Sequence, residues 1–252
     1  MYRKQATFRF YEELNDFLPS AKVKVAFAYS FNGSPSVKDA VEALGVPHVE
    51  VDLILVNGQS ADFAYRLQHG DYVSVYPTFE TLDISGITRL REKPLRHTKL
   101  ILDVHLGKLA RYLRMLGFDT LYRNDYSDAE IVRLAVAERR IILTRDVGLL
   151  MAKAVTHGYW VRSQKPQEQV REVMGRFDLY RQINPFCRCI RCNGMLAEVP
   201  KASILDRLEP LTRRCYSQFY QCSGCGNIYW EGTHYERMRD FICNLKGDIK
   251  QQ

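Results

Sequence analysis

Four cysteines in the last third of the sequence have the spacing of a metal site. Cys189 and Cys192 form one C-x-x-C pair, and Cys222 and Cys225 form a second pair after 29 intervening residues. Two close thiolate pairs supply the tetrahedral sulfur ligand set that structural Zn²⁺ prefers. We therefore predict one structural zinc ion bound by these four side chains.

The other three cysteines do not suggest a disulfide scaffold. All seven cysteines lie after residue 186, and the start of the chain lacks the apolar stretch of a secretory signal. Cys215 and Cys243 are expected to be bystanders, and Cys187 is the one residue that could replace Cys189 as a ligand. Metal binding in a reducing cytoplasm is the interpretation that we favour. Gly194 and Gly226 follow the two pairs and suit the turns that such sites need.

Three aspartates fall where strands end or a helix begins. Asp103 ends the apolar run "LILD", Asp146 ends "IILTRD", and Asp128 opens the helical segment between them. A single Asp after a strand is most often a turn or helix N-cap residue. The repeated arrangement favours a second interpretation, because the carboxyl ends of parallel strands meet at one edge of a sheet. Clustered carboxylates need a cation, and oxygen ligands suit Mg²⁺ or Mn²⁺, which can activate water against a phosphodiester.

Basic side chains follow Asp103 at helical spacing. One face of the segment 106–117 is apolar and holds Leu106, Leu109, Leu113 and Leu116. The opposite face holds Lys108, Arg111 and Arg114. On an isolated helix such a stripe is usually a solvated face. Beside a carboxylate cluster it can instead follow a phosphate backbone.

The elements that position these residues alternate between strands and helices. We expect strands over 99–104, 119–125, 141–146 and 159–163, and helices over 106–117, 127–140, 148–158 and 165–177. This alternation predicts an α/β domain with a parallel sheet covered by helices. Glu130 stands three residues after Ser127, the spacing of a capping box, so we rank it below Asp128 as a metal ligand.

The first 88 residues have a different pattern. Their order of strands and one helix, β-β-α-β-β, resembles the ubiquitin-like β-grasp fold. For the helix we expect Ser34 as N-cap, Pro35 at the first helical position and Gly45 as its end, and we expect a turn at Asn57-Gly58.

Within the β-grasp fold this part looks most like small sulfur-carrier proteins. Those carriers act through a free C-terminal Gly-Gly, whereas here the chain continues through "YPTFETLDISG". We therefore expect a docking role, toward a protein partner, RNA or the rest of the chain.

The charge of the chain is divided along its length. Residues 1–88 carry 7 Lys or Arg and 11 Asp or Glu, whereas the remainder carries 29 Lys or Arg and 18 Asp or Glu. The stretch 89–97 is basic and contains a proline, so it is expected to be a linker. We accordingly divide the chain into a β-grasp domain (1–88), a linker (89–97), an α/β domain (98–182) and a zinc ribbon with the C-terminal tail (183–252). No run of about 18 apolar residues is present, so no membrane span is expected.

The runs "ILDVHLGKLARYLRMLGFDT", "SDAEIV" and "RRIILTRD" resemble the PIN-like RNase family known as the Mut-seven C-terminal RNase domain. Many members of this family carry an N-terminal ubiquitin-like domain and a C-terminal zinc ribbon. The resemblance implies a PIN-like, metal-dependent ribonuclease fold whose catalytic acids match Asp103, Asp128 and Asp146.

From the residues and this resemblance we predict a metal-dependent ribonuclease in which the basic helix and the zinc ribbon bind RNA. The residues assigned to RNA binding are Lys108, Arg111, Arg114 and Arg145. The alternative is a noncatalytic RNA-binding or adaptor protein on a PIN-like scaffold, which the presence of all three acids disfavours.

Overall fold

The computed structural model describes residues 3–77, 90 and 98–247, with side chains described up to residue 245. These residues form two compact units. The first holds the described residues up to 97 together with 132–160, and the second holds 98–131 and 161–247. Apart from Leu90, the expected basic linker lies outside the described residues. No helix in the described part of the chain is both long and apolar enough to cross a membrane.

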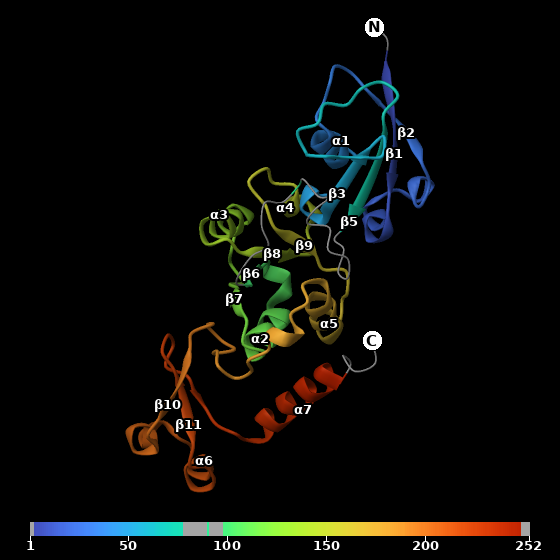
Figure 1. Ribbon diagram of the computed structural model, residues 1–252. Coiled ribbons are helices and arrows are strands. Elements are labelled where there is room, and N and C mark those ends of the chain that lie inside the picture. The colour runs from blue at the N-terminus through green and yellow to red at the C-terminus, as the bar shows by residue number, and fades with distance from the viewer. Residues whose placement is uncertain (1–2, 78–89, 91–97, 248–252) are drawn as a thin grey trace. The chain divides into compact units, whose positions relative to one another are not determined.

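The first unit contains a five-stranded mixed sheet (Figure 1). Its strand order is β2-β1-β5-β3-β4, and β1 and β5 are parallel while the other pairs are antiparallel. The strands are β1 (Lys4–Phe10), β2 (Phe27–Phe31), β3 (Val51–Val56), β4 (Gln59–Ala61) and β5 (Tyr72–Pro77). Helix α1 (Val37–Ala43) buries Val37, Ala40 and Val41 in the core with the inner face of this sheet. This is the predicted β-grasp arrangement.

A two-residue turn joins β3 to β4, as the sequence predicts. Asn57 and Gly58 have φ angles of +50° and +80°, the backbone of a tight hairpin turn. Val56 pairs with Gln59 across the turn. The Asn57 side chain adds a hydrogen bond from its Nδ2 to Asp71 Oδ1 at 3.0 Å. The hairpin therefore depends on the two residues that are able to adopt this conformation.

Helix α1 begins later than the sequence suggests. Ser36, and not Ser34, is its N-cap: the Ser36 hydroxyl accepts from the Asp39 N–H at 3.1 Å, and the Asp39 carboxylate accepts from the Ser36 N–H. This reciprocal pair is a capping box, which satisfies two backbone donors. The expectation of Ser34 was wrong because it placed Pro35 inside the helix, where Pro35 in fact precedes the cap. Gly45 ends the helix with a φ of +96°, as expected.

The remainder of the first unit supplies two parallel strands, β8 (Ile141–Thr144) and β9 (Gly158–Trp160). Helix α4 (Val147–Leu150) is shorter than the expected 148–158. Its continuation is a turn in which the Val155 N–H bonds to Ala152 O. Val155 is buried, and its carbonyl lies 2.8 Å from Nε2 of His48, so packing against the β-grasp domain replaces further helix here.

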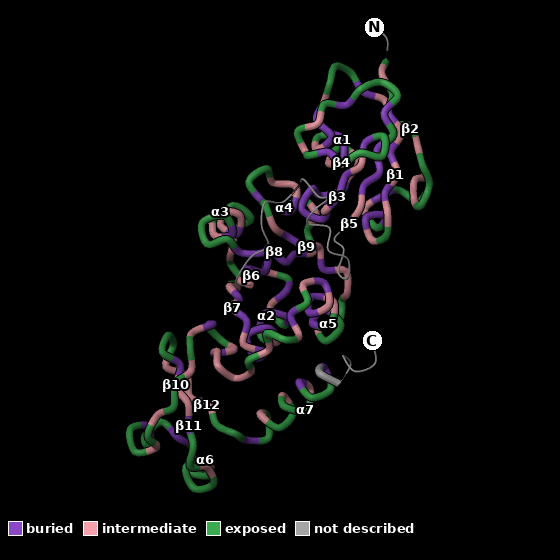
Figure 2. Tube along the Cα trace, viewed as in Figure 1, coloured by how far each residue is buried: buried purple, intermediate pink, exposed green. Residues whose placement is uncertain are grey.

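The second unit begins with the other two parallel strands, β6 (Lys99–Leu102) and β7 (Asp119–Leu121). Helix α2 (Gly107–Met115) packs against α5 (Pro166–Arg176). The four leucines predicted to form the apolar face of the segment 106–117 are all buried; Figure 2 colours the trace by burial. Helix α3 (Asp128–Glu138) opens in this unit. All four α/β strands and their helices thus occur in the expected order.

The C-terminal part of the second unit is a three-stranded antiparallel ribbon. Its strands are β10 (Leu196–Val199), β11 (Phe219–Cys222) and β12 (Ile228–Tyr229). A small core of Ile204, Leu208 and Phe219 supports it, with Tyr216 packed alongside. The ribbon aromatics Phe219 and Tyr216 therefore serve packing.

Two helices and several 3-10 turns complete the structure. The helices are α6 (Pro210–Cys215) and α7 (Thr233–Gly247). The 3-10 turns are η1 (Glu12–Phe17), η2 (Ser20–Lys22), η3 (His48–Glu50), η4 (Val104–Leu106), η5 (Tyr180–Gln182) and η6 (Lys201–Arg207). Helix α7 contacts α2 through the rings of Phe241 and Tyr112, whose centroids are 4.9 Å apart.

We expect Ser36→Ala to lower the free energy of unfolding by about 1 kcal/mol, because it removes the N-cap acceptor of α1. Ser34→Ala is the matched control and should change stability little, since the exposed Ser34 hydroxyl caps no helix. Urea unfolding of both variants followed by circular dichroism measures the difference. Equal losses in the two variants would contradict the assignment of the cap.

Candidate metal centre and acidic site

The four predicted cysteine ligands lie together in the second unit. All four Sγ atoms are within 4.8 Å of one another. The Cys189–Cys225 sulfur distance is 3.6 Å and the Cys192–Cys222 distance is 3.3 Å. A tetrahedral metal with bonds of about 2.3 Å needs sulfurs about 3.8 Å apart. The donor set therefore fits a metal ion, and among the described residues it is the one cluster of three or more such ligands.

The backbone around these cysteines is shaped to present the sulfurs. In the second knuckle, the N–H groups of Gly224 and Cys225 point at Cys222 Sγ from 3.3 and 3.5 Å. In the first, a Cβ on Gly194 would lie 2.9 Å from Cys222 Sγ, so no larger residue fits there without movement. Gly226 has a φ of +69°, which favours glycine. Both glycines singled out from the sequence are thus required by the turns.

A tyrosine contacts the cluster from outside it. The Tyr229 hydroxyl lies 3.0 Å from Cys189 Sγ, and burial raises the pKa of Tyr229, so this hydroxyl keeps its proton and is able to donate to a thiolate. Hydrogen bonds of this kind orient metal-binding thiolates. The three remaining cysteines are outside the cluster, as expected; Cys187 instead donates to Asn184 O at 3.1 Å.

Arg114 connects the first cysteine knuckle to the α/β elements. Its side chain is only 3% exposed. Nη1 donates to Arg191 O at 2.8 Å and to Ile190 O at 3.4 Å, both between the two cysteines of the knuckle. Nε donates to Thr120 O at 2.9 Å and Nη2 to Tyr122 O at 3.3 Å. The guanidinium thus points into the protein and does not belong to the solvent-facing stripe in which the helical wheel places it.

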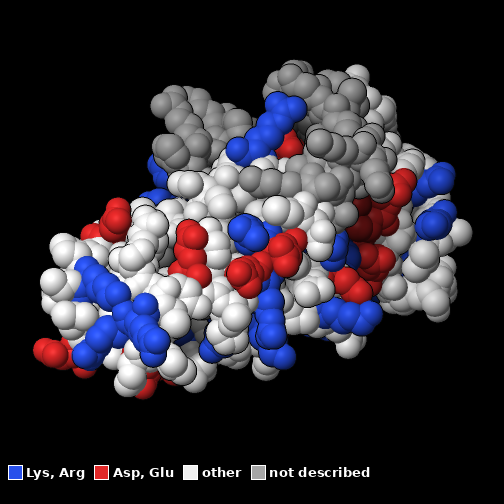
Figure 3. All heavy atoms as spheres, turned by 90° about the horizontal axis from the view of Figure 1, so that it is seen from below, with Lys and Arg blue, Asp and Glu red and all other residues white. Residues whose placement is uncertain are grey.

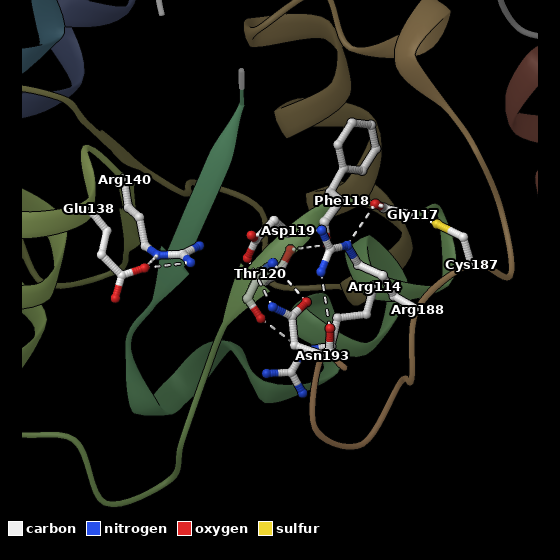
Figure 4. Close-up of polar contacts among 10 residues, drawn as sticks. All are labelled: Arg114, Gly117, Phe118, Asp119, Thr120, Glu138, Arg140, Cys187, Arg188 and Asn193. Atoms are coloured by element: carbon white, nitrogen blue, oxygen red, sulfur yellow. Dashed lines mark hydrogen bonds and ion pairs between the residues drawn. The ribbon is translucent and has the colours of Figure 1, made fainter. Parts of the chain in front are cut away.

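The same knuckle is also bound to strand β7 by side chains of its own. Asn193 Oδ1 accepts from the Thr120 N–H at 3.0 Å, and Asn193 Nδ2 donates to Asp119 Oδ1 at 2.9 Å (Figure 4). Arg188 donates to Gly117 O at 3.2 Å. The knuckle is therefore fixed to β7 and to the end of α2 by several hydrogen bonds.

Asp103 follows strand β6 and begins the turn η4. Its Oδ1 accepts from the His105 N–H at 2.8 Å, and the side chain is 4% exposed. Asp103 is thus an N-cap residue, which is the structural role that the sequence favours for an isolated Asp. A cap of this kind uses one carboxylate oxygen and does not prevent the carboxylate from binding a cation.

Asp146 repeats this arrangement after strand β8. Its Oδ1 accepts from the Gly148 N–H at 2.7 Å, and its own N–H donates to Thr144 Oγ1 at 2.8 Å. Asp146 is exposed, and it is the N-cap of α4. A Cβ on Gly148 would lie 3.1 Å from Asp146 Oδ1, so glycine allows the close approach of this carboxylate.

Asp128 is exposed at the first position of α3, beside the predicted capping box. Ser127 donates to Glu130 Oε2 through its N–H at 2.9 Å and through its hydroxyl at 2.8 Å. These backbone and side-chain hydrogen bonds lower the pKa of Glu130. Glu130 therefore has the structural role expected of it. Asp103 and Asp128 belong to the second unit and Asp146 to the first, and their convergence stays a prediction.

Two of the basic residues assigned to RNA binding are exposed on α2, namely Lys108 and Arg111. Arg145 is half-buried, beside Asp146. In the face shown in Figure 3, basic and acidic side chains are interspersed. The distribution of charge therefore does not identify a binding surface on this face. A binding surface has to be identified from individual residues.

The sequence did not reveal the roles of Arg114, Asn193 and Tyr229. Their partners include carbonyls, amides and sulfurs that are remote in sequence, such as the carbonyl of Arg191, 77 residues after Arg114. A usable signal was nevertheless present for Asn193, because Asn directly after a C-x-x-C pair suits the left-handed backbone that it adopts, with a φ of +73°.

Two family models match the chain. Residues 98–242 match the family model for the Mut7-C RNase domain, and residues 3–83 match that for the Mut7-C ubiquitin domain. No curated protein matches the chain. Among solved structures, the crystal structure of H. volcanii small archaeal modifier protein 1 is similar, at 18% identity and a TM-score of 0.25. That match covers 30% of this chain and 99% of the modifier protein.

We expect Arg114→Lys to lower the free energy of unfolding of the second unit by about 2–3 kcal/mol, because lysine cannot reproduce the guanidinium's fork of buried hydrogen bonds. Arg111→Lys, on the exposed side of the same helix, is the matched control and should change stability by less than about 0.5 kcal/mol. Urea denaturation and hydrogen exchange of residues 187–195 provide the measurements. An Arg114→Lys protein as stable as the control would contradict the anchoring role.

Proposed function

Because the chain belongs to the Mut7-C RNase domain family, we propose that it is a ribonuclease that hydrolyses RNA with a divalent ion held by Asp103, Asp128 and Asp146. The observation that carries this proposal is the family match over residues 98–242, more than half of the chain. That range contains all three aspartates and all four cysteines of the metal cluster.

The three carboxylates suit the ion that we propose. Mg²⁺ and Mn²⁺ prefer carboxylate oxygens, and Asp128 and Asp146 are exposed where such an ion can reach them. When bound, the ion supplies Lewis-acid polarisation of the phosphodiester. The backbone N–H groups at the two caps each bind one carboxylate oxygen and so restrict the rotation of Asp103 and Asp146.

RNA is proposed to lie along the exposed side of α2. Lys108 and Arg111 are the exposed cations of that helix, and Arg145 adjoins Asp146. Contacts of this type follow the phosphate backbone without reading its sequence. Arg114 supports this surface indirectly, because it fixes the helix to the cysteine knuckle.

The cysteine cluster is proposed to bind Zn²⁺ as a closed structural site. Four thiolates leave no position for substrate, and Asn193 of the first knuckle is hydrogen-bonded to β7. Thiols must be reduced to bind a metal, so we also propose a cytoplasmic location. The ubiquitin-like domain is proposed to offer a docking surface to a protein partner.

The protein should contain one zinc ion per chain. Cys222→Ser should lose it, because a closed site needs all four ligands, and the ribbon should then unfold locally. Cys215→Ser changes an exposed cysteine outside the cluster, so this variant should still contain one zinc ion per chain. Elemental analysis of freshly purified protein measures the content, and a parent protein with no zinc would refute the assignment.

Asp146→Asn should reduce RNA cleavage by about 10²-fold or more, since it removes a charge that the divalent ion needs. The variant should fold normally, because Asn is as good an N-cap residue as Asp and can accept the same Gly148 N–H. Cleavage of a labelled RNA with Mg²⁺ or Mn²⁺ at matched protein concentrations measures the effect.

Glu130→Gln is the control for this experiment, because Gln also forms a capping box with Ser127. It should retain most of the activity. Cleavage that persists in both EDTA and Asp146→Asn would refute the metal mechanism. A parent protein that binds RNA and cleaves none of it would favour the noncatalytic RNA-binding alternative.

A further inference from the structure

Trp160 lies at the end of β9 and bonds to the loop that carries Asp146. Its indole Nε1–H donates to Arg145 O at 3.2 Å. The Arg145 carbonyl and the Asp146 N–H belong to one planar peptide group. The other end of that group is also held, because the Asp146 N–H donates to Thr144 Oγ1 at 2.8 Å. Rotation of this peptide would break both hydrogen bonds, so Trp160 helps to set the direction of the Asp146 side chain.

The ubiquitin-like domain in turn holds Trp160. Glu50 Oε1 accepts from the Trp160 main-chain N–H at 2.6 Å, and the Glu50 side chain is fully buried. On the indole itself, the Phe17 ring packs with its centroid 5.1 Å away and an interplanar angle of 46°. Both Glu50 and Phe17 lie inside the range 3–83 that matches the ubiquitin domain model.

A second contact joins the ubiquitin-like domain to the turn before β9. His48 Nε2 lies 2.8 Å from Val155 O, in the turn between α4 and β9. Gly158, in β9, lies so close to Val49 Cγ2 that a Cβ there would contact it at 3.4 Å. The turn η3 (His48–Glu50) of the β-grasp domain thus packs against β9 and the turn before it. The contact also includes the buried Glu50 carboxyl, which accepts from the Trp160 N–H.

We propose that the ubiquitin-like domain is a positioning element of the acidic site, acting through Trp160 on the Arg145–Asp146 peptide. This inference rests on the proposed function, in which Asp146 binds the divalent ion. Glu50 and Phe17 fix the backbone and the ring of Trp160, and the indole N–H fixes the peptide before Asp146. Trp160 is therefore a positioning residue, not a catalytic one.

The first test compares Trp160→Phe with Trp230→Phe. The phenyl ring keeps a contact with Phe17 but has no N–H for Arg145 O. Trp160→Phe should weaken Mn²⁺ binding by about three- to tenfold, the effect of one lost hydrogen bond, and should lower kcat while leaving the KM for RNA unchanged. Trp230→Phe makes the same change at the only other tryptophan, in the ribbon, and should leave Mn²⁺ affinity unchanged. Mn²⁺ affinity is measured by electron paramagnetic resonance.

The contribution of the ubiquitin-like domain is tested by Phe17→Leu. This change leaves the site loop itself intact and removes the ring that packs on the indole. It should also weaken Mn²⁺ binding, by about two- to fivefold, as expected for loss of an aromatic pair. Parent-like Mn²⁺ affinity in either Trp160→Phe or Phe17→Leu overturns the proposal.

A spectroscopic measurement covers the case in which these variants fold poorly. In the Trp230→Phe protein, Trp160 is the sole tryptophan, so its fluorescence should be quenched as paramagnetic Mn²⁺ binds beside it. Adding Asp146→Asn should abolish the quenching. Mn²⁺ binding without quenching overturns the positioning role but leaves the proposed function standing. A parent protein that binds no Mn²⁺ overturns both.

Discussion

One buried guanidinium holds much of the second unit together. Arg114 donates to main-chain carbonyls of the strand β7 region and of the first cysteine knuckle. A guanidinium can be buried only when its donors are satisfied, and burial lowers the pKa of Arg114 against the opposing influence of Cys192 and Cys189. The carbonyls therefore stabilise the cation, and the cation fixes the knuckle. Helix α2 and the metal cluster are in this way parts of a single arrangement.

Local spacing explains why much of the structure could be predicted. The cysteine pairs, the Asn57-Gly58 turn and the Ser127–Glu130 capping box each depend on residues a few positions apart, and each occurs as expected. The apolar face of α2 also follows from helical periodicity. Arg114 could not be placed in this way, because two of its acceptors, the carbonyls of Ile190 and Arg191, lie 76 and 77 residues further along the chain. The end of α4 was missed for a similar reason, since a contact from His48 replaces helix there.

The aspartates show how a structural role and a chemical one can coexist. Asp103 and Asp146 are both N-cap residues, which is the ordinary reason for an Asp after a strand. The caps also restrict the rotation of each carboxylate. An orientation fixed in advance reduces the entropy lost when a ligand binds, so capping favours the ion site that we propose.

The hydrogen bond from Trp160 to Glu50 closes a loop of 110 residues, and that from His48 to Val155 one of 107. Contacts so distant in sequence form late, because the loop must close before they contribute. During synthesis, the ubiquitin-like domain emerges before Trp160, and the Glu50 carboxyl cannot bind the Trp160 N–H until the ribosome has added 110 residues after Glu50. Until then the Glu50 carboxyl lacks the hydrogen bond that it makes with Trp160 in the folded protein. The order of translation thus sets when this domain can reach its final packing.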